Sequence, residues 1–215
     1  MRICFVNEGK LYSLAEKLKG EKFDLLLLSP IGRVNYQSEI EGRSGRLKSV
    51  ATLSGMLSAP IFVGCETEAG GFLRKSVAVA DRGKLVGISD MTHAIDRAYS
   101  AGASLKLYQT AVGKAGVLVG EDLFFPETAK LLADSGADFL VCILDHIHGD
   151  REITLLRATS FFFGLPVFSV CEGYSLAVTE GTLSFATPQS PAFYRAESKR
   201  EYHLVETRRR GFFGT

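Results

Sequence analysis

The sequence predicts an α/β protein in which a mixed system of sheets is covered on the outside by helices. Three observations lead to this prediction. The apolar run "FDLLLLSP" stops at Pro30 and is typical of a strand that is buried on both faces. Segments with apolar residues at helical spacing alternate with such strands early in the chain. Later segments form hairpin patterns, which add antiparallel strands.

Predicted strands and helices alternate in the first part of the chain. A helix is predicted over 10–20, where Leu11, Leu14, Ala15 and Leu18 recur at helical spacing before Gly20, a typical C-cap. A second helix is predicted over about 43–58, because it must end before Pro60. Strands are predicted over 2–7, 23–30, 60–68 and the two arms of 75–89, which turn at Asp81-Arg82-Gly83.

A similar series follows from residue 105. A strand pair over 105–122 is expected to turn at Val112-Gly113-Lys114. Pro126 suits the first turn of a helix over 125–137 that Gly136 closes, and a further helix over 152–164 ends at Gly164. The remaining predicted strands cover 138–144, 166–173, 175–187 and 200–207. No low-complexity linker or internal repeat divides the chain, which predicts one domain over residues 1–215.

Composition narrows the class of protein. The net charge of +1 gives no basic excess for a nucleic acid, and no apolar run reaches the ~20 residues of a membrane helix. The start "MRICFVNEGK" lacks the pattern of a signal peptide. Cys4, Cys65, Cys142 and Cys171 share no CxxC spacing, which favours reduced, buried thiols. We therefore expect a cytoplasmic protein without a cofactor, a nucleic-acid partner or a membrane partner.

Residues 113–128, "GKAGVLVGEDLFFPET", provide the most specific motif. A Gly-Val-rich strand leads to Gly120, Glu121 and Asp122, then to Phe-Pro-Glu, a helix and Gly-Ala-Asp. This order resembles the nucleophile motif of the carbon–nitrogen hydrolase (nitrilase) superfamily. Residues 155–175, "LLRATSFFFGLPVFSVCEGYS", and the hairpin 75–89 give two weaker matches in the right order. The resemblance implies a four-layer α-β-β-α sandwich, and members of the superfamily commonly pair through helices.

The same resemblance implies a chemistry that can be checked by position. Members use a Glu as general base, a Lys that stabilises the oxyanion, and a Cys nucleophile that is acylated by an amide or nitrile. In this sequence the expected positions hold Ile31, Met91 and Gly120, and shifting the first by one residue gives Pro30. We therefore assign no catalytic residue.

Five residues are candidates for lining the vacant pocket. Cys65 and Cys171 each precede a glutamate at a strand end, and both thiols are interpreted as core residues. The resemblance nevertheless implies that the segment of Cys171 and Glu172 approaches the pocket. Glu121 and Asp122 are adjacent, so on an extended chain they point to opposite sides and form no carboxylate pair. The resemblance gives Asp122 an architectural role.

"DHIHGDRE", residues 145–152, is the segment most similar to a metal site. His146 and His148 would share one face of a strand near Asp145 and Asp150, yet no further ligand is evident. A solvated polar loop is the preferred interpretation. Nearby, Phe161, Phe162 and Phe163 cannot all face one core, so at least one meets another layer or, equally, a second subunit of a homodimer.

Three functional hypotheses follow. The first, which we prefer, is a non-catalytic relative that binds a small molecule or serves as a partner subunit. The second is a diverged amide or nitrile hydrolase with relocated catalytic groups at Cys171, Glu121 or a metal held by His146 and His148. The third is a purely structural module, which would have a filled pocket and a large exposed apolar face.

Overall fold

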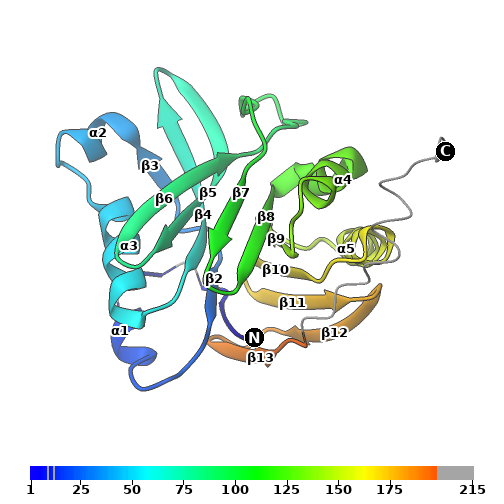
Figure 1. Cartoon of the computed structure of the whole chain (residues 1–215). Helices are drawn as coiled ribbons and strands as arrows, with labels where there is room; N and C mark the ends of the chain where they lie inside the picture. Colours follow the sequence, from blue (N-terminus) through cyan, green and yellow to red (C-terminus); the bar gives the residue numbers. More distant parts are fainter. Residues whose placement is uncertain (9, 12, 198–215) are drawn as a thin grey trace.

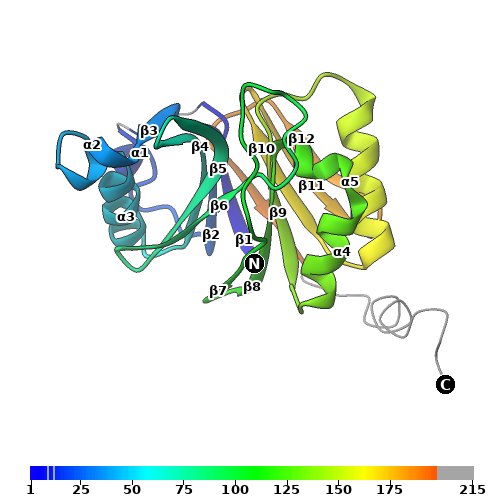
Figure 2. The ribbon, with the colours of Figure 1, turned by 90° about the horizontal axis from the view of Figure 1, so that it is seen from above.

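The computed structural model describes residues 1–8, 10, 11 and 13–197, and within them the chain forms two sheets with helices on their outer faces (Figure 1). Seen from above, the layers follow the order helices, sheet, sheet, helices (Figure 2). The predicted four-layer α-β-β-α sandwich is therefore confirmed. None of the described helices is long and apolar enough to cross a membrane.

The first sheet contains both chain-terminal and hairpin strands. Parallel pairing joins β1 to β2 and β2 to β4, whereas β13, β5 and β6 are antiparallel to their neighbours. The short β3 pairs with β4 outside the main path. The order is β13 (Ala192–Arg195), β1 (Arg2–Val6), β2 (Leu25–Leu28), β4 (Ile61–Ala69), β5 (Phe72–Asp81) and β6 (Lys84–Asp90), with β3 (Arg33–Asn35) beside β4.

The second sheet has a parallel centre, β8-β9-β10, and antiparallel strands on both sides. Its order is β12 (Thr182–Thr187), β11 (Tyr174–Thr179), β10 (Val167–Cys171), β9 (Phe139–Ile143), β8 (Gly113–Val119) and β7 (Leu107–Thr110). The helices are α1 (Leu14–Lys17), α2 (Tyr36–Ile40) and α3 (Arg46–Leu57) beside the first sheet, and α4 (Pro126–Asp134) and α5 (Asp150–Phe163) on the second.

Strand β2 shows how the layers are held together. Its side chains alternate, so that Leu25 and Leu27 enter the core between the sheets while Leu26 and Leu28 enter the core beneath α1 and α3. None of the four has any exposed surface. The uninterrupted apolar run therefore does what the sequence predicts for a strand covered on both faces.

Two expected elements differ in extent. The helix expected over 10–20 is reduced to α1, because burial of Leu14 and Leu18 needs only one turn, and Ser13 before it has a left-handed φ of 73°. The turn expected at 112–114 lies at Ala111-Val112, since Thr110 pairs with Gly113. The Thr110 hydroxyl donates to the Gly113 carbonyl and fixes this earlier turn.

Four elements were not predicted, namely β3, α2, β13 and a 3-10 helix over Gly120–Phe124. Asn35 caps α2 by accepting a hydrogen bond from the Ser38 amide, a signal present in the sequence but inside a loop-like stretch. The strand predicted over 200–207 lies outside the described residues. In contrast, Gly164 ends α5 in a left-handed conformation, as predicted.

Gly64 on β4 packs closely against the second sheet. A Cβ built there would lie 2.8 Å from Ile143 Cγ2 of the other sheet and 2.9 Å from Pro30 Cγ. We expect Gly64→Ala to lower the free energy of unfolding by about 1–3 kcal/mol, because neither neighbour is at the end of a flexible chain. Urea unfolding monitored by circular dichroism measures the effect.

The matched control is Gly45→Ala, since no atom lies within 4 Å of a Cβ at Gly45. Gly45 is the N-cap of α3, where alanine is less favourable than glycine, so the cost of this substitution should stay below about 1 kcal/mol. Equal effects of the two substitutions would contradict the close approach of the sheets at Gly64.

Candidate functional site

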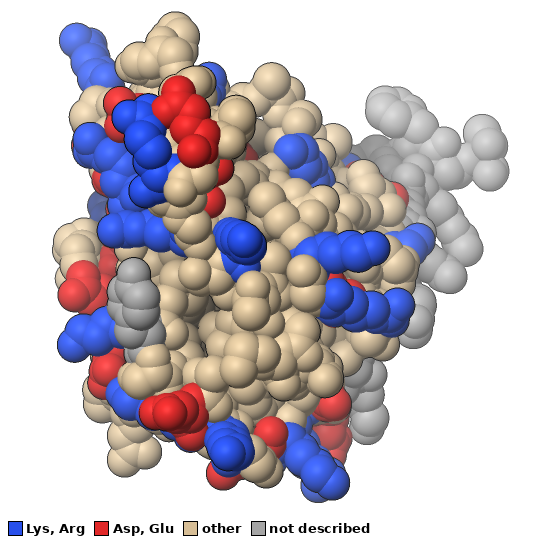
Figure 3. Space-filling model, turned by 90° about the vertical axis from the view of Figure 1, so that its left-hand side faces the viewer, with Lys and Arg blue, Asp and Glu red and all other residues tan. Residues whose placement is uncertain are grey.

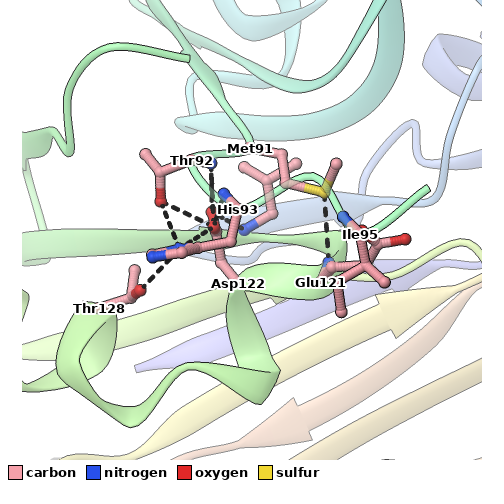
Figure 4. Close-up of polar contacts among 8 residues, drawn as sticks. Met91, Thr92, His93, Ile95, Glu121, Asp122 and Thr128 are labelled. Carbon is pink, nitrogen blue, oxygen red and sulfur yellow. Dashed lines mark hydrogen bonds and ion pairs between the residues drawn. The ribbon is translucent and has the colours of Figure 1, made fainter. Parts of the chain in front are cut away.

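The site is centred on Gly120, at the end of β8 and the start of the 3-10 helix. Its φ of +54° is in the left-handed region, which glycine adopts at little cost. A Cβ at Gly120 would lie 3.2 Å from Met91 Sδ and 3.3 Å from Lys75 Cδ. The thioether of Met91 also accepts a hydrogen bond from the Glu121 amide at 3.4 Å (Figure 4).

Two of the three positions assigned from the motif thus meet in space. Met91, directly after β6, lies against Gly120, and neither residue carries a thiol or a cation. The third, Ile31, packs against the core beneath α1 and α3, and its amide donates to the Gly64 carbonyl. Pro30, the shifted alternative, lies against Gly64.

Lys75 is a residue of the site that the sequence did not reveal. It comes from β5, and its Nζ lies 2.7 Å from Asp145 Oδ2 and 3.7 Å from Glu121 Oε1. The ammonium also lies 4.8 Å from the ring centroid of Tyr99, within the range of a cation–π contact. A cation therefore stands beside Gly120 although position 91 holds methionine.

The charge state of Lys75 follows from these contacts. Burial lowers its pKa, but the hydrogen bond and charge of Asp145 and the charge of Glu121 outweigh burial, so the pKa is raised above 10.5. Lys75 therefore stays protonated at neutral pH. It can donate hydrogen bonds or offset negative charge, whereas an ammonium has no lone pair for nucleophilic attack.

A chain of polar contacts continues from Lys75 across the first sheet. Lys75 pairs in register with Glu66 on β4. Glu66 accepts a hydrogen bond of 2.6 Å from the Tyr99 hydroxyl and lies 3.2 Å from Arg33 Nε. The Glu66 contact raises the pKa of Tyr99, so this phenol stays protonated.

A cavity of about 140 Å³ opens beside Gly120. Its lining is polar and carries charges of both signs. The residues are Lys75, Gly120, Glu121, Phe124, Leu144, Asp145, His146, His148, Arg151 and Glu152. Arg151 forms an ion pair with the buried Glu152 at 2.7 Å. The other Lys, Arg, Asp and Glu side chains that line the cavity are Lys75, Glu121 and Asp145.

Asp122 and Glu121 hold the site together without forming a carboxylate pair. They occupy a 3-10 turn, and the expectation of an extended chain at this point was wrong. The buried Asp122 carboxylate accepts hydrogen bonds from the Thr92 amide and hydroxyl and from the His93 amide (Figure 4). Glu121 accepts from the amides of Ile95 and Asp96, so both acids anchor the segment that follows β6.

A sequence model of carbon–nitrogen hydrolases matches residues 9–185. The chain belongs to the carbon–nitrogen hydrolase family. A probable nitrilase of Schizosaccharomyces pombe is 27% identical over 111 residues, which are 48% of this chain and 41% of that protein. The chain thus matches less than half of the length of this curated relative.

Solved structures extend the likeness to the whole fold. Nit3 of Saccharomyces cerevisiae, a member of branch 10 of the nitrilase superfamily, has a TM-score of 0.75 at 16% identity, covering 100% of this chain and 95% of that one. The carbon–nitrogen hydrolase of Helicobacter pylori G27 has a TM-score of 0.78 at 17% identity, with coverages of 96% and 92%. An amidase variant of Nesterenkonia AN1 scores 0.78 at 15% identity, with coverages of 97% and 94%.

None of the four cysteines lines the cavity beside Gly120. All four are buried and unpaired. Cys65 packs in the core beneath α3 and Cys171 in the core beneath α4 and α5, on the outer faces of the sheets. Burial raises the pKa of Cys65 to about 12 and that of Cys171 to about 11, so both are thiols at neutral pH.

The other candidates divide between the pocket and its surroundings. His146 and His148 line the cavity with ring centroids 5.9 Å apart. The described part of the chain contains no group of three His, Cys, Asp or Glu residues that could hold a metal ion. Glu172 is exposed in the turn after β10, where its amide donates to the Asp145 carbonyl.

The buried thiols predict a pH dependence of stability. Because burial raises their pKa values above 9.0, their contribution to stability is complete below about pH 9 and is lost as pH rises toward the folded-state values. We expect the free energy of unfolding to decrease between pH 9 and about pH 11. Urea unfolding at several pH values measures this decrease.

Tyrosines and lysines titrate in the same range, so a cysteine variant provides the control. In Cys65→Ala the overall stability is lower, but the slope against pH should be shallower than in the wild type. Unchanged slopes, or rapid alkylation of Cys171 by iodoacetamide at pH 7, would contradict the assignment of buried, protonated thiols.

Proposed function

We propose that this carbon–nitrogen hydrolase relative binds a small polar molecule beside Gly120 without forming an acyl-enzyme. One observation supports the proposal most directly. The position of the expected nucleophile is a glycine, and the thioether of Met91 occupies the space next to it. A hydrolysis through a covalent intermediate needs a thiol or hydroxyl at that point.

The charges of the pocket indicate which molecule it suits. Lys75 contributes one positive charge, and Glu121 and Asp145 contribute two negative ones. Both Glu121 oxygens have partners, whereas Asp145 is half exposed and can accept further hydrogen bonds. A short amide or amine with N–H donors fits this arrangement, and about 140 Å³ holds only a few non-hydrogen atoms.

The open pocket argues against a purely structural module, which would fill it with side chains. It is compatible with the second hypothesis, a hydrolase with relocated groups. Lys75, Glu121 and Asp145 favour that alternative, because a cation and carboxylates lie beside Gly120. In such a reaction water would attack the carbonyl carbon, a carboxylate would accept its proton, and Lys75 would offset the charge on oxygen. The protonated carboxyl would then give this proton to the nitrogen as the carbon–nitrogen bond breaks, which releases the amine and the acid.

A turnover assay separates the two hypotheses. Short aliphatic amides and nitriles are incubated with the protein, ammonia release is followed, and the intact mass is measured. We expect no turnover above background and no covalent addition.

In nuclear magnetic resonance titrations, Asp145→Asn should weaken amide binding by about tenfold, because it removes a charge-assisted hydrogen bond.

Gly120→Cys tests whether a thiol at this position would react with a small amide. Its Cβ would lie 3.2 Å from Met91 Sδ and 3.3 Å from Lys75 Cδ, so these unbranched side chains would shift slightly, and the left-handed backbone costs about 1–2 kcal/mol. We expect this variant to gain an adduct with acrylamide that the wild type lacks. Turnover by the wild type that disappears in Lys75→Met would contradict the proposal and support the relocated hydrolase.

We further propose that the protein forms a homodimer through the outer faces of α4 and α5. Leu131 on α4 and Phe161 and Phe162 on α5 are each exposed by half or more. Exposed large apolar side chains on neighbouring helices are typical of subunit contacts.

We also propose that the protein is located in a reducing compartment such as the cytoplasm, because its four buried cysteines form no disulfide.

Light scattering coupled to gel filtration tests the dimer. Leu131→Glu combined with Phe161→Glu should convert a dimer into a monomer, because charges would be buried in an apolar contact. Ile40→Glu on α2 is the control, since Ile40 is 81% exposed on the opposite side of the molecule. A wild-type monomer at micromolar concentration would contradict the proposal.

A further inference from the structure

A larger hollow than the cavity at Gly120 lies on the face that carries α1 to α3. It has a volume of about 810 Å³, within the range of about 300–1,000 Å³ typical of ligand pockets. The segment after β1, the segment after β2 and one side of α3 form its walls. We call it the α3 groove; its residues are Lys10, Leu11, Ile31, Arg43, Ser44, Gly45, Arg46, Lys48, Ser49, Thr52, Leu53 and Met56.

The charge of the α3 groove has one sign. Four cations line it and no carboxylate does. Figure 3 shows this face, with Lys and Arg side chains over its upper part and some Asp and Glu side chains among them. Arg43 forms an ion pair with Glu41, whereas Lys10 and Lys48 have no ion pair among residues 1–8, 10, 11 and 13–197. The groove therefore keeps an excess of positive charge.

The side chains of Arg46 and Glu39 interact with the backbone near the groove and do not pair with each other. Arg46 Nη1 donates to the carbonyls of Ile31 and Arg33 at 3.0 Å each, so its guanidinium is held in place without a carboxylate. Glu39, the acid close to α3, accepts from the amides of Arg46 and Leu47. Its charge compensates the helix N-terminus, and it does not line the groove.

The α3 groove has a charged end and an apolar end. On α3 the lining residues recur at helical spacing, so they share one face of the helix. Arg43, Arg46 and Lys48 lie at or before the first turn of α3. Leu53 and Met56 lie in its last turns, about 8–15 Å further along the helix. Met56 is 66% exposed, which leaves its thioether available for contact.

We propose that the α3 groove binds a free, single-chain organic anion, with its carboxylate or phosphate head near Arg43 and Lys48 and its aliphatic chain along Leu53 and Met56. Charge complementarity selects the anionic head. The apolar stretch selects the chain, since burial of each CH₂ group stabilises the complex. This site is separate from the pocket at Gly120 and does not depend on the function proposed for that pocket.

Titration calorimetry with dodecyl phosphate on the full chain tests the proposal. We expect saturable binding of one molecule per chain that weakens as salt is added. Arg43→Gln and Lys48→Gln should each weaken it by about tenfold, because each removes a charge-assisted contact. Met56→Gln should weaken dodecyl phosphate binding while leaving the much weaker binding of inorganic phosphate unchanged.

Control variants and probes make the result decisive. Lys19→Gln and Lys84→Gln remove exposed cations outside the groove and should leave the affinity unchanged. All these positions are exposed, so circular dichroism should show an unaltered fold. Equal binding of neutral dodecyl maltoside, insensitivity to both groove cations, or binding only to vesicles of anionic phospholipid would overturn the proposal.

Discussion

The geometry of the site depends on the buried carboxylate of Asp122. It is 1% exposed and accepts hydrogen bonds from the backbone of Thr92 and His93. A buried charge is tolerated only when such donors surround it, so these bonds are required once Asp122 is enclosed. They connect the segment after β6 in one sheet to the turn after β8 in the other. As a result Met91 is fixed beside Gly120.

This connection explains how the turn keeps its shape without a reactive side chain. Gly120 adopts its left-handed conformation at little cost, and the Met91 thioether accepts from the next amide in the turn. The scaffold thus needs no thiol for its stability. The cation beside Gly120 comes from β5, where Lys75 is balanced by two carboxylates rather than left unpaired. The charge of Lys75 is therefore neutralised within the protein, and one carboxylate charge remains in excess.

Membership of the carbon–nitrogen hydrolase family and the chemistry of this site are separate questions. The family match and the solved structures establish the fold, and their low identities carry no information on individual side chains. A variant of the Nesterenkonia amidase has acrylamide added to an active-site cysteine. In the present chain the atoms next to Gly120 are the thioether sulfur of Met91 and the Cδ of Lys75.

The sequence by itself determined the elements whose patterns are local. The apolar run of β2, the Pro126 start of α4 and the Gly164 end of α5 depend on neighbours in the chain, and the motif around Gly120 identified the family. Only the tertiary structure decided the rest. Lys75 reaches the site because β5 lies opposite β8, and it meets Asp145 from a segment 70 positions away. The α3 groove likewise joins three separate segments. Spacing along the chain contains no trace of such contacts, because they form only when the sheets and helices pack together.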